Sequence, residues 1–381
     1  MNFASNVKIF VISNLGSGSF GDELNLLGVL YKYRRYKPIR LTIVANEPQI
    51  FREYHPILGK HASIIKSNFV FGFISVIPPL LRSNLVITTG GKYMKNLYEI
   101  FYLAYIALLG KLLRRKILLE SIGIYPYGTR VGFNIEALDK ELNSYKLGLI
   151  RLLLTKLLLA LADRVSVRDI SSKILINLII GKKVLFEIDP IFNLPINDTN
   201  SLLQDESHLL LGLAIGYVID KRFLNLMKEL YKAIVYLMKQ RPRLKIICVP
   251  FSIPTIKDLK SPDNDLRLCL QLYAHLPDEL KAKFVVVKER LKPIEAIQLL
   301  RKLDCIVALR YHPFLLAIKL GVPCLIIPHE LKVLDYINIL TKYKLRDSVI
   351  IGVVTPDTVS SHEIVAYFER CIDNISWVPS C

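Results

Sequence analysis

The sequence predicts an α/β protein made of two similar halves, each with a parallel sheet, and three observations support this prediction. Short apolar runs of strand length alternate along the chain with longer segments of helical spacing. Polar or glycine residues follow every predicted strand of the first half, as a parallel sheet with a ligand-binding crevice requires. The only extended polar stretch, 196–208, separates the halves and is the best linker.

The elements of the first half follow from these apolar runs. Each predicted strand is rich in Val, Ile or Leu, which is typical of a strand buried on both faces. The predicted strands are 7–13, 40–45, 84–89, 116–124, 163–167 and 184–188, and the predicted helices are 22–34, 97–113, 147–162 and one from about Ser171.

The second half repeats this plan after the linker. Its predicted strands are 209–215, 244–249, 284–287, 305–309, 322–327 and 348–353, and its predicted helices are 221–239, 266–274, 294–302, 313–319 and 362–375. We therefore expect one domain at 1–195, a second at 209–361, and a closing helix and tail at 362–381.

Composition limits the class of protein and of partner. A chain of 381 residues suits two domains, and 52% hydrophobic residues exclude disorder. The net charge of +18 predicts an acidic partner, such as anionic lipid or a phosphorylated substrate. Nucleic acid is excluded as a partner, because the basic residues are spread through amphipathic segments and form no dense tail.

The compartment is predicted to be the cytoplasm. The six cysteines have no metal-type spacing and are interpreted as core thiols in a reducing compartment, and the N-terminus lacks a secretory signal. The apolar helices 97–113 and 147–162 are interrupted by charge, so neither suits a membrane span. Basic residues beside their apolar stripes leave two alternatives open, ordinary packed helices or peripheral contact with an anionic inner membrane face.

One stretch concentrates residues suited to an anion. Arg310 and His312 follow the predicted strand 305–309, and Pro313 stands where we expect the next helix to begin. A guanidinium, an imidazole and a helix N-terminus at one place predict an anion-binding site.

Two further basic residues have two interpretations each. Arg168 also follows a predicted strand; it either binds an anion or forms a local ion pair with Asp169. Lys332 either contacts a ligand or is an ordinary solvated lysine.

The loop GSGSFG at 16–21 fits the dinucleotide-binding pattern G-x-G-x-x-G between a strand and a helix. Asp22 and Glu23 follow it directly, and carboxylates at a helix N-terminus would oppose a pyrophosphate there. A dehydrogenase is therefore the last of the alternatives. Asp22 either caps the helix or presents a carboxylate to a substrate hydroxyl.

Several motifs together resemble the polysaccharide pyruvyl transferase family, and the resemblance spans most of the chain. They are SFGDE (19–23), the strand ending in Gly90 and Gly91, VSVRD (165–169), DP (189–190), and the unit from RYH to GVP (310–323) with Lys332. The resemblance implies two Rossmann-like domains facing across a cleft, as in glycosyltransferases of the B type. The first domain would bind the acceptor and the second the donor. One departure is Gly216, where the family commonly has an arginine.

The resemblance implies a transferase of polysaccharide biosynthesis. Such enzymes move the enolpyruvyl unit of phosphoenolpyruvate onto two hydroxyls of a sugar in a cell-surface glycan or its lipid-linked precursor, forming a pyruvate ketal and releasing phosphate. The donor's carboxylate and phosphate suit bidentate arginines, and a histidine beside this anion would be protonated and act as the acid. No metal or cofactor is needed. Carried over, the substrate-binding residues are Arg168, Arg310, Gly90, Gly91 and Lys332, and the catalytic residues are His312 and Asp22.

Two other functions stay open. A glycosyltransferase of the same architecture would consume a sugar nucleotide and make no use of phosphoenolpyruvate. A non-enzymatic module would bind acidic glycan or lipid through its charge, and His312→Ala would leave its function intact while salt abolished it.

Overall fold

The computed structural model describes most of the chain, and the structural statements below concern the residues that it describes. These are 7–15, 19–34, 40–45, 62–66, 72–90, 97–124, 148–181, 184–195, 208–216, 221–253, 264–328, 331–342, 351–354 and 359–375. The chain forms two compact units. The first unit comprises residues 1–17 and 21–194, and the second comprises 18–20 and 195–381.

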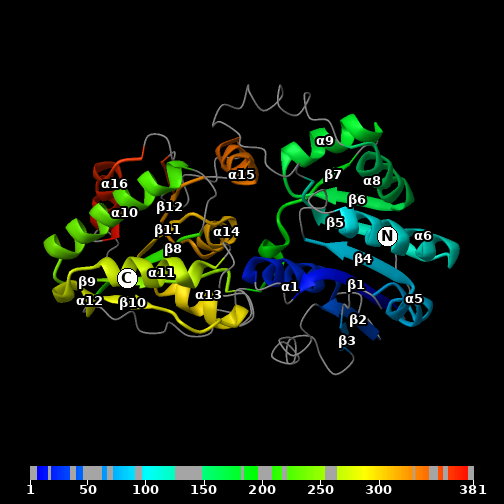
Figure 1. The fold of residues 1–381 in the computed structure, drawn as a ribbon, viewed down its shortest axis with the longest axis horizontal. Helices are drawn as coiled ribbons and strands as arrows, with labels where there is room; N and C mark the ends of the chain where they lie inside the picture. The colour runs from blue at the N-terminus through cyan, green and yellow to red at the C-terminus, as the bar shows by residue number, and fades with distance from the viewer. Residues whose placement is uncertain are drawn as a thin grey trace. The chain divides into compact units, whose positions relative to one another are not determined.

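The first unit is built on a seven-stranded sheet in which all neighbouring strands are parallel (Figure 1). Its strand order is β3-β2-β1-β4-β5-β6-β7. The strands are β1 (Lys8–Leu15), β2 (Arg40–Ala45), β3 (Ala62–Lys66), β4 (Leu85–Thr89), β5 (Lys116–Ile122), β6 (Arg164–Val167) and β7 (Leu185–Phe186).

The second unit has a six-stranded sheet, also parallel throughout. Its strands are β8 (Leu209–Ala214), β9 (Leu244–Cys248), β10 (Phe284–Val286), β11 (Cys305–Ala308), β12 (Cys324–Ile326) and β13 (Ile351–Val353). The order β10-β9-β8-β11-β12-β13 is the Rossmann order, and the first six strands of the other sheet follow it too. The prediction of two parallel-sheet α/β domains is confirmed.

Helices connect the strands, as parallel pairing requires. In the first unit these are α1 (Phe20–Arg34), α4 (Gly72–Ser75), α5 (Ile77–Arg82), α6 (Leu97–Leu112), α8 (Leu149–Leu161), α9 (Ile170–Ile180) and the 3₁₀ turn η2 (Pro190–Asn193). In the second unit they are α10 (Lys221–Gln240), α11 (Asp265–His275), α12 (Asp278–Lys281), α13 (Pro293–Arg301), α14 (Tyr311–Leu320), α15 (Leu331–Lys342) and α16 (Ser361–Ile375).

Each unit has its own apolar core. In the first, side chains of β4 and β5 pack with those of α6 and α8. In the second, α10 and α16 cover the strands, so the closing helix α16 is part of this core. The five cysteines that the structure describes are buried and free, as expected for core thiols.

Several elements differ from the sequence prediction. Helices α4, α5, α12 and α15 were not predicted. The strand β3 was not predicted, because it is partly exposed and therefore lacks a buried apolar run. Helix α1 begins at Phe20, so Asp22 lies inside its first turn and does not cap it from outside. Helix α14 begins at Tyr311, so Pro313 is its third residue. A proline is tolerated there because the first N–H groups of a helix have no intrahelical partner.

Candidate active site

The carboxyl ends of β8 and β11 are neighbours in the second sheet, and Arg310 lies at this point. Strand order reverses here, which is where open α/β sheets bind ligands. The Arg310 side chain lies over Gly216. A Cβ atom added to Gly216 would come within 2.1 Å of the Arg310 Nε atom. A glycine after β8 therefore leaves room for Arg310.

Arg310 is held by a buried carboxylate, Asp265, the first residue of α11. The Arg310 Nη2 donates to Asp265 Oδ1 at 2.5 Å, and the backbone N–H groups of Phe251 and Ser252 donate to Oδ2 at 3.2 and 2.8 Å. Burial raises the pKa of Asp265 to about 6, against the opposing effect of the Arg310 charge. The Arg310 side chain stays 22% exposed, so a ligand can reach part of the guanidinium.

Sequence reasoning missed Asp265. It lies 45 residues before Arg310 and belongs to no recognisable motif. The nearest signal was its place at the start of a helix preceded by Asn264, whose side chain accepts from the backbone N–H of Arg267.

The N-terminus of α14 brings together the predicted residues of the second half. His312 is the second residue of this helix, is half-buried, and packs edge-on against the Tyr311 ring at 5.2 Å between centroids. The Lys332 ammonium lies 5.1 Å from the centroid of the same Tyr311 ring. Arg310 occupies the N-cap position and makes no side-chain capping bond. His312 and Lys332 thus lie beside Tyr311 in the first turn of α14, next to Arg310 at its N-cap, an arrangement suited to an anion.

The corresponding place in the first unit is the end of β4, which neighbours β1. Gly90 adopts a left-handed backbone with φ of 77°, where a side chain would be strained. A Cβ atom added there would lie 3.8 Å from Asn25 Oδ1 and 3.9 Å from Asp22 Oδ1. Gly90 and Asp22, both predicted from the sequence, are therefore close together, while Gly91 lies outside the described residues.

Asn25 is a second residue that sequence reasoning missed. Its side chain is fully buried and its Oδ1 accepts from the Thr89 hydroxyl at 2.7 Å. In the described structure its Nδ2 group has no hydrogen-bond partner. The available signal was helical spacing, because a residue three positions after Asp22 lies on the same face of α1.

Arg168 follows β6 but is buried, with 3% of its side chain exposed. Its Nη1 donates to Asp189 Oδ2 at 3.1 Å, while Asp169 caps α9 by accepting from the backbone N–H of Ser172 at 2.6 Å. Removing one partner of a charge pair so deeply buried strongly destabilises the folded protein, because the other charge stays buried without compensation. The contact of Arg168 with substrate stays a prediction.

Asp189 and Pro190 anchor helix α1. Asp189 also accepts from the backbone N–H of Ile191 at 3.1 Å, which starts the turn η2. The Pro190 carbonyl oxygen lies 1.9 Å from where a Cβ atom of Gly28 would stand, so α1 packs directly on this turn. The DP motif therefore fixes the position of α1.

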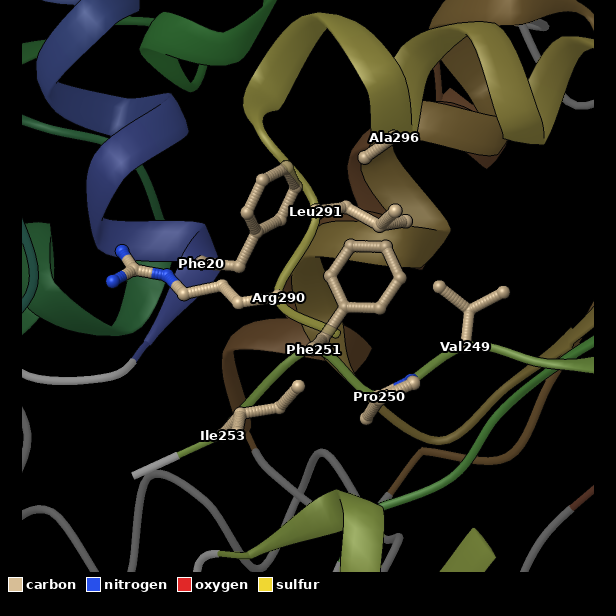
Figure 2. A pocket seen from close by; sticks show the side chains of 8 residues that line it. All are labelled: Phe20, Val249, Pro250, Phe251, Ile253, Arg290, Leu291 and Ala296. Atoms are coloured by element: carbon tan, nitrogen blue, oxygen red, sulfur yellow. The ribbon is translucent and has the colours of Figure 1, made fainter. Parts of the chain in front are cut away.

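Figure 2 shows a small hollow in the second unit. Phe20, which belongs to this unit by its contacts, packs edge-on against Phe251 at 5.4 Å, and its N–H donates to the Phe251 carbonyl at 3.0 Å. The Arg290 side chain points away from the apolar ones, and burial lowers the pKa of its guanidinium. The lining residues are Phe20, Val249, Pro250, Phe251, Ile253, Arg290, Leu291 and Ala296. None of the predicted site residues is among them.

The glycines Gly16 and Gly18 of the dinucleotide-like loop lie outside the described residues. Among those described, no three His, Cys, Asp or Glu side chains are grouped in a way that would hold a metal ion.

Solved structures share this fold at low sequence identity. The UDP-GlcNAc 2-epimerase of Methanocaldococcus jannaschii is 13% identical with a TM-score of 0.58, over 96% of this chain and 92% of that one. The Neisseria meningitidis UDP-GlcNAc 2-epimerase, solved with UDP-GlcNAc, is 12% identical with a TM-score of 0.57, over 98% of this chain and 92% of that one. The ADP-heptose LPS heptosyltransferase II of E. coli is 11% identical with a TM-score of 0.51, over 97% of this chain and 99% of that one. These similarities establish the two-domain fold alone.

A comparison with curated protein sequences finds no match. The family model of polysaccharide pyruvyl transferases, in contrast, matches residues 20–330, which include β8 and β11 at the strand-order reversal of the second unit and the residues from Asp22 to His312. The chain therefore belongs to the polysaccharide pyruvyl transferase family, and it is a transferase.

Proposed function

We propose that this protein transfers the enolpyruvyl unit of phosphoenolpyruvate to a sugar of a cell-surface polysaccharide or its lipid-linked precursor, forming a pyruvate ketal. The observation that carries the proposal is the basic N-terminus of α14, where Arg310 occupies the N-cap position and His312 and Lys332 lie beside the Tyr311 ring. It lies where β8 and β11 end, at the place in the sheet that suits a small anionic ligand.

Phosphoenolpyruvate fits this arrangement because it carries a carboxylate and a phosphate. Arg310 supplies a guanidinium whose position Asp265 fixes, and a fixed planar donor suits either anion. The N–H groups of α14 that precede its first intrahelical bond, those of Tyr311 and His312, supply further donors to a phosphate. Pro313 contributes none. In this proposal the donor substrate needs no metal or organic cofactor.

The proposed reaction begins with a proton transfer. His312 gives a proton to the methylene carbon of phosphoenolpyruvate, which becomes a methyl group, and the adjacent carbon becomes cationic. A sugar hydroxyl adds to this carbon and loses its proton. The bond from this carbon to the phosphate oxygen then breaks, and phosphate leaves with the bonding electron pair. The second hydroxyl adds to the carbon in its place and gives its proton to the departing phosphate. Arg310 and the α14 amides stabilise the growing negative charge.

We place the acceptor sugar at the first unit. Asp22, Asn25 and Gly90 lie together at the end of β4 and offer a carboxylate and a buried amide to sugar hydroxyls. In this proposal Asp22 takes the hydroxyl proton and Gly91 lies beside the acceptor. Arg168 supports the site through Asp189, or binds an anion itself. The proposal puts the reaction in the cytoplasm, where phosphoenolpyruvate is made.

Phosphate release from phosphoenolpyruvate tests the proposal. The purified protein is incubated with a panel of sugars and lipid-linked glycans, beside His312→Ala, Arg310→Ala and, as control, the exposed His275→Ala on α11. We expect acceptor-dependent release that the first two substitutions reduce by about a thousandfold and the control leaves unchanged.

Donor binding is measured on the same samples, so that a missing acceptor is not mistaken for a wrong donor. If phosphoenolpyruvate does not bind, and a sugar nucleotide is consumed, the protein is a nucleotide-sugar glycosyltransferase. If His312→Ala leaves all function intact while salt abolishes it, the protein is a charge-driven binding module.

A further inference from the structure

Helix α8 exposes leucines where a surface helix normally exposes polar side chains. Leu149, Ile150, Leu153 and Leu157 are 70%, 63%, 56% and 41% exposed. Thr155, on the opposite face, is buried. The outward face of α8 is therefore apolar, although the helix also buries Leu158 and Leu159.

Helix α6 presents a second apolar stripe beside the first. Leu97, Phe101, Leu108 and Leu112 are spaced to share one face of α6, and Leu112 is 71% exposed. The two helices pack against each other in one apolar cluster and lie next to each other in Figure 1. Two neighbouring helices thus expose eight large apolar side chains, and clusters of this kind mark interaction surfaces.

Basic side chains lie beside these stripes. Arg114 and Lys116 are exposed directly after α6, and Lys156 is exposed on α8. The Arg115 Nη2 donates to the Leu81 carbonyl oxygen at 2.8 Å, which joins the end of α5, with its exposed Leu81, to the end of α6. An apolar surface with adjacent cations matches the boundary between acyl chains and anionic headgroups of a bilayer.

We propose that the surface formed by α6 and α8 binds peripherally to an anionic lipid bilayer. The apolar side chains enter the headgroup boundary, and the basic side chains contact lipid phosphates. No helix in the described part of the chain is long and apolar enough to cross a membrane, so the contact is interfacial. A second copy of the chain is a poorer occupant, because it would bring two basic rims together on a protein of net charge +18. The inference is independent of the pyruvyl transfer proposed above.

Vesicle flotation tests this surface. The probes are vesicles of phosphatidylcholine alone and of phosphatidylcholine mixed with phosphatidylglycerol. The variant Leu112→Glu/Leu153→Glu removes apolar contacts, and the control Leu224→Glu changes an equally exposed leucine, 75% exposed, on α10 of the second unit. We expect the protein and the control to float with the anionic vesicles, less so at high salt, and the double variant to bind at least tenfold more weakly, about 1.4 kcal/mol or more.

A second pair of substitutions separates charge from apolar contact. Arg114→Gln/Lys116→Gln should weaken binding about tenfold to anionic vesicles and leave binding to phosphatidylcholine unchanged. Thermal unfolding checks that each variant is folded. We expect all of them to fold, because the substituted positions are exposed.

Three results would overturn the inference. They are absence of flotation with any vesicle, equal flotation of the double variant and the protein, and a dimer in solution that the double variant converts to a monomer. The last result would assign the face to a second copy of the chain.

Discussion

Arg310 and Arg168 invite comparison, because both follow a parallel strand and both pair with a fully buried aspartate. Arg310 pairs with Asp265 and keeps 22% of its side chain exposed, whereas Arg168 pairs with Asp189 and keeps 3%. Asp265 is the first residue of a helix, while Asp189 starts the turn that seats α1. The same local pattern therefore gives a reachable cation in one unit and a buried structural pair in the other.

The two strand-order reversals differ in a similar way. The one in the second unit is cationic, with Arg310, His312 and Lys332. The one in the first unit offers the carboxylate of Asp22 and the amide of Asn25. Two sheets that share the same strand order thus present different side chains at their strand ends, and we expect these side chains to decide which ligand each binds.

The largest difference between the arginines should appear in stability. Arg168→Met leaves Asp189 buried without its charge partner, and we expect the free energy of unfolding to fall by about 3–5 kcal/mol. Arg310→Met should cost less, about 1 kcal/mol, because the Arg310 side chain is already partly exposed and two backbone N–H groups still donate to the buried Asp265. Urea denaturation measures both. Equal losses would show that the two pairs have the same role, and a large loss of phosphoenolpyruvate affinity with intact stability in Arg168→Met would assign Arg168 to the substrate.

Asp265 should make stability depend on pH. Its pKa in the folded protein is about 6, against an ordinary value of 3.8 that we assign to the unfolded chain. Between these pH values the folded protein keeps a proton that the unfolded chain has lost. Its contribution to stability therefore falls by up to about 3 kcal/mol as the pH rises from about 4 to 6, and is constant above.

Asp265→Asn removes this titration. Urea denaturation of the protein and the variant from pH 4 to pH 7 measures the difference between them, which should move in favour of the variant as the pH rises. A difference that does not change over this range would contradict the raised pKa.

Gly216→Ala tests the reach of Arg310. The new methyl group would meet the Arg310 side chain, which is flexible enough to move aside, so the fold should survive and the guanidinium should be displaced. We expect phosphoenolpyruvate affinity to fall about tenfold, with the free energy of unfolding changed by less than about 1 kcal/mol. Gly148→Ala is the matched control, since nothing lies within 4 Å of its added Cβ atom. Unchanged affinity in Gly216→Ala would separate Arg310 from donor binding.

The smallest effect is expected at Lys332. Its ammonium contacts the Tyr311 ring from a half-buried position, so Lys332→Ala should raise the KM for phosphoenolpyruvate about threefold. Lys292→Ala, an exposed lysine at the start of α13, serves as control. Identical kinetics of the two variants would show that Lys332 is an ordinary solvated lysine that does not contact the substrate.

Much of the fold was predictable from neighbouring residues. Buried parallel strands such as β4 and β11 are continuous apolar runs, and the residues after them carry the turns and the site. The residues Arg310 and His312 therefore stood out at the end of a strand, and the motifs around them indicated the family. The partly exposed β3 gave no such signal. Helix α14 begins at Tyr311, two residues before the predicted start at Pro313, because a helix tolerates proline throughout its first turn.

Only the tertiary structure decided which side chains these residues meet. The sheet places β8 next to β11, although two strands and four helices of the described structure lie between them in sequence, and this brings Gly216 under Arg310. It also decides that Asp265 holds Arg310, that Asp189 pairs with the buried Arg168, and that Leu149 and Leu153 of α8 are exposed. The physical reason is separation along the sequence. Apolar periodicity depends on residues a few positions apart, whereas burial and charge pairing depend on strands and helices that are distant in sequence.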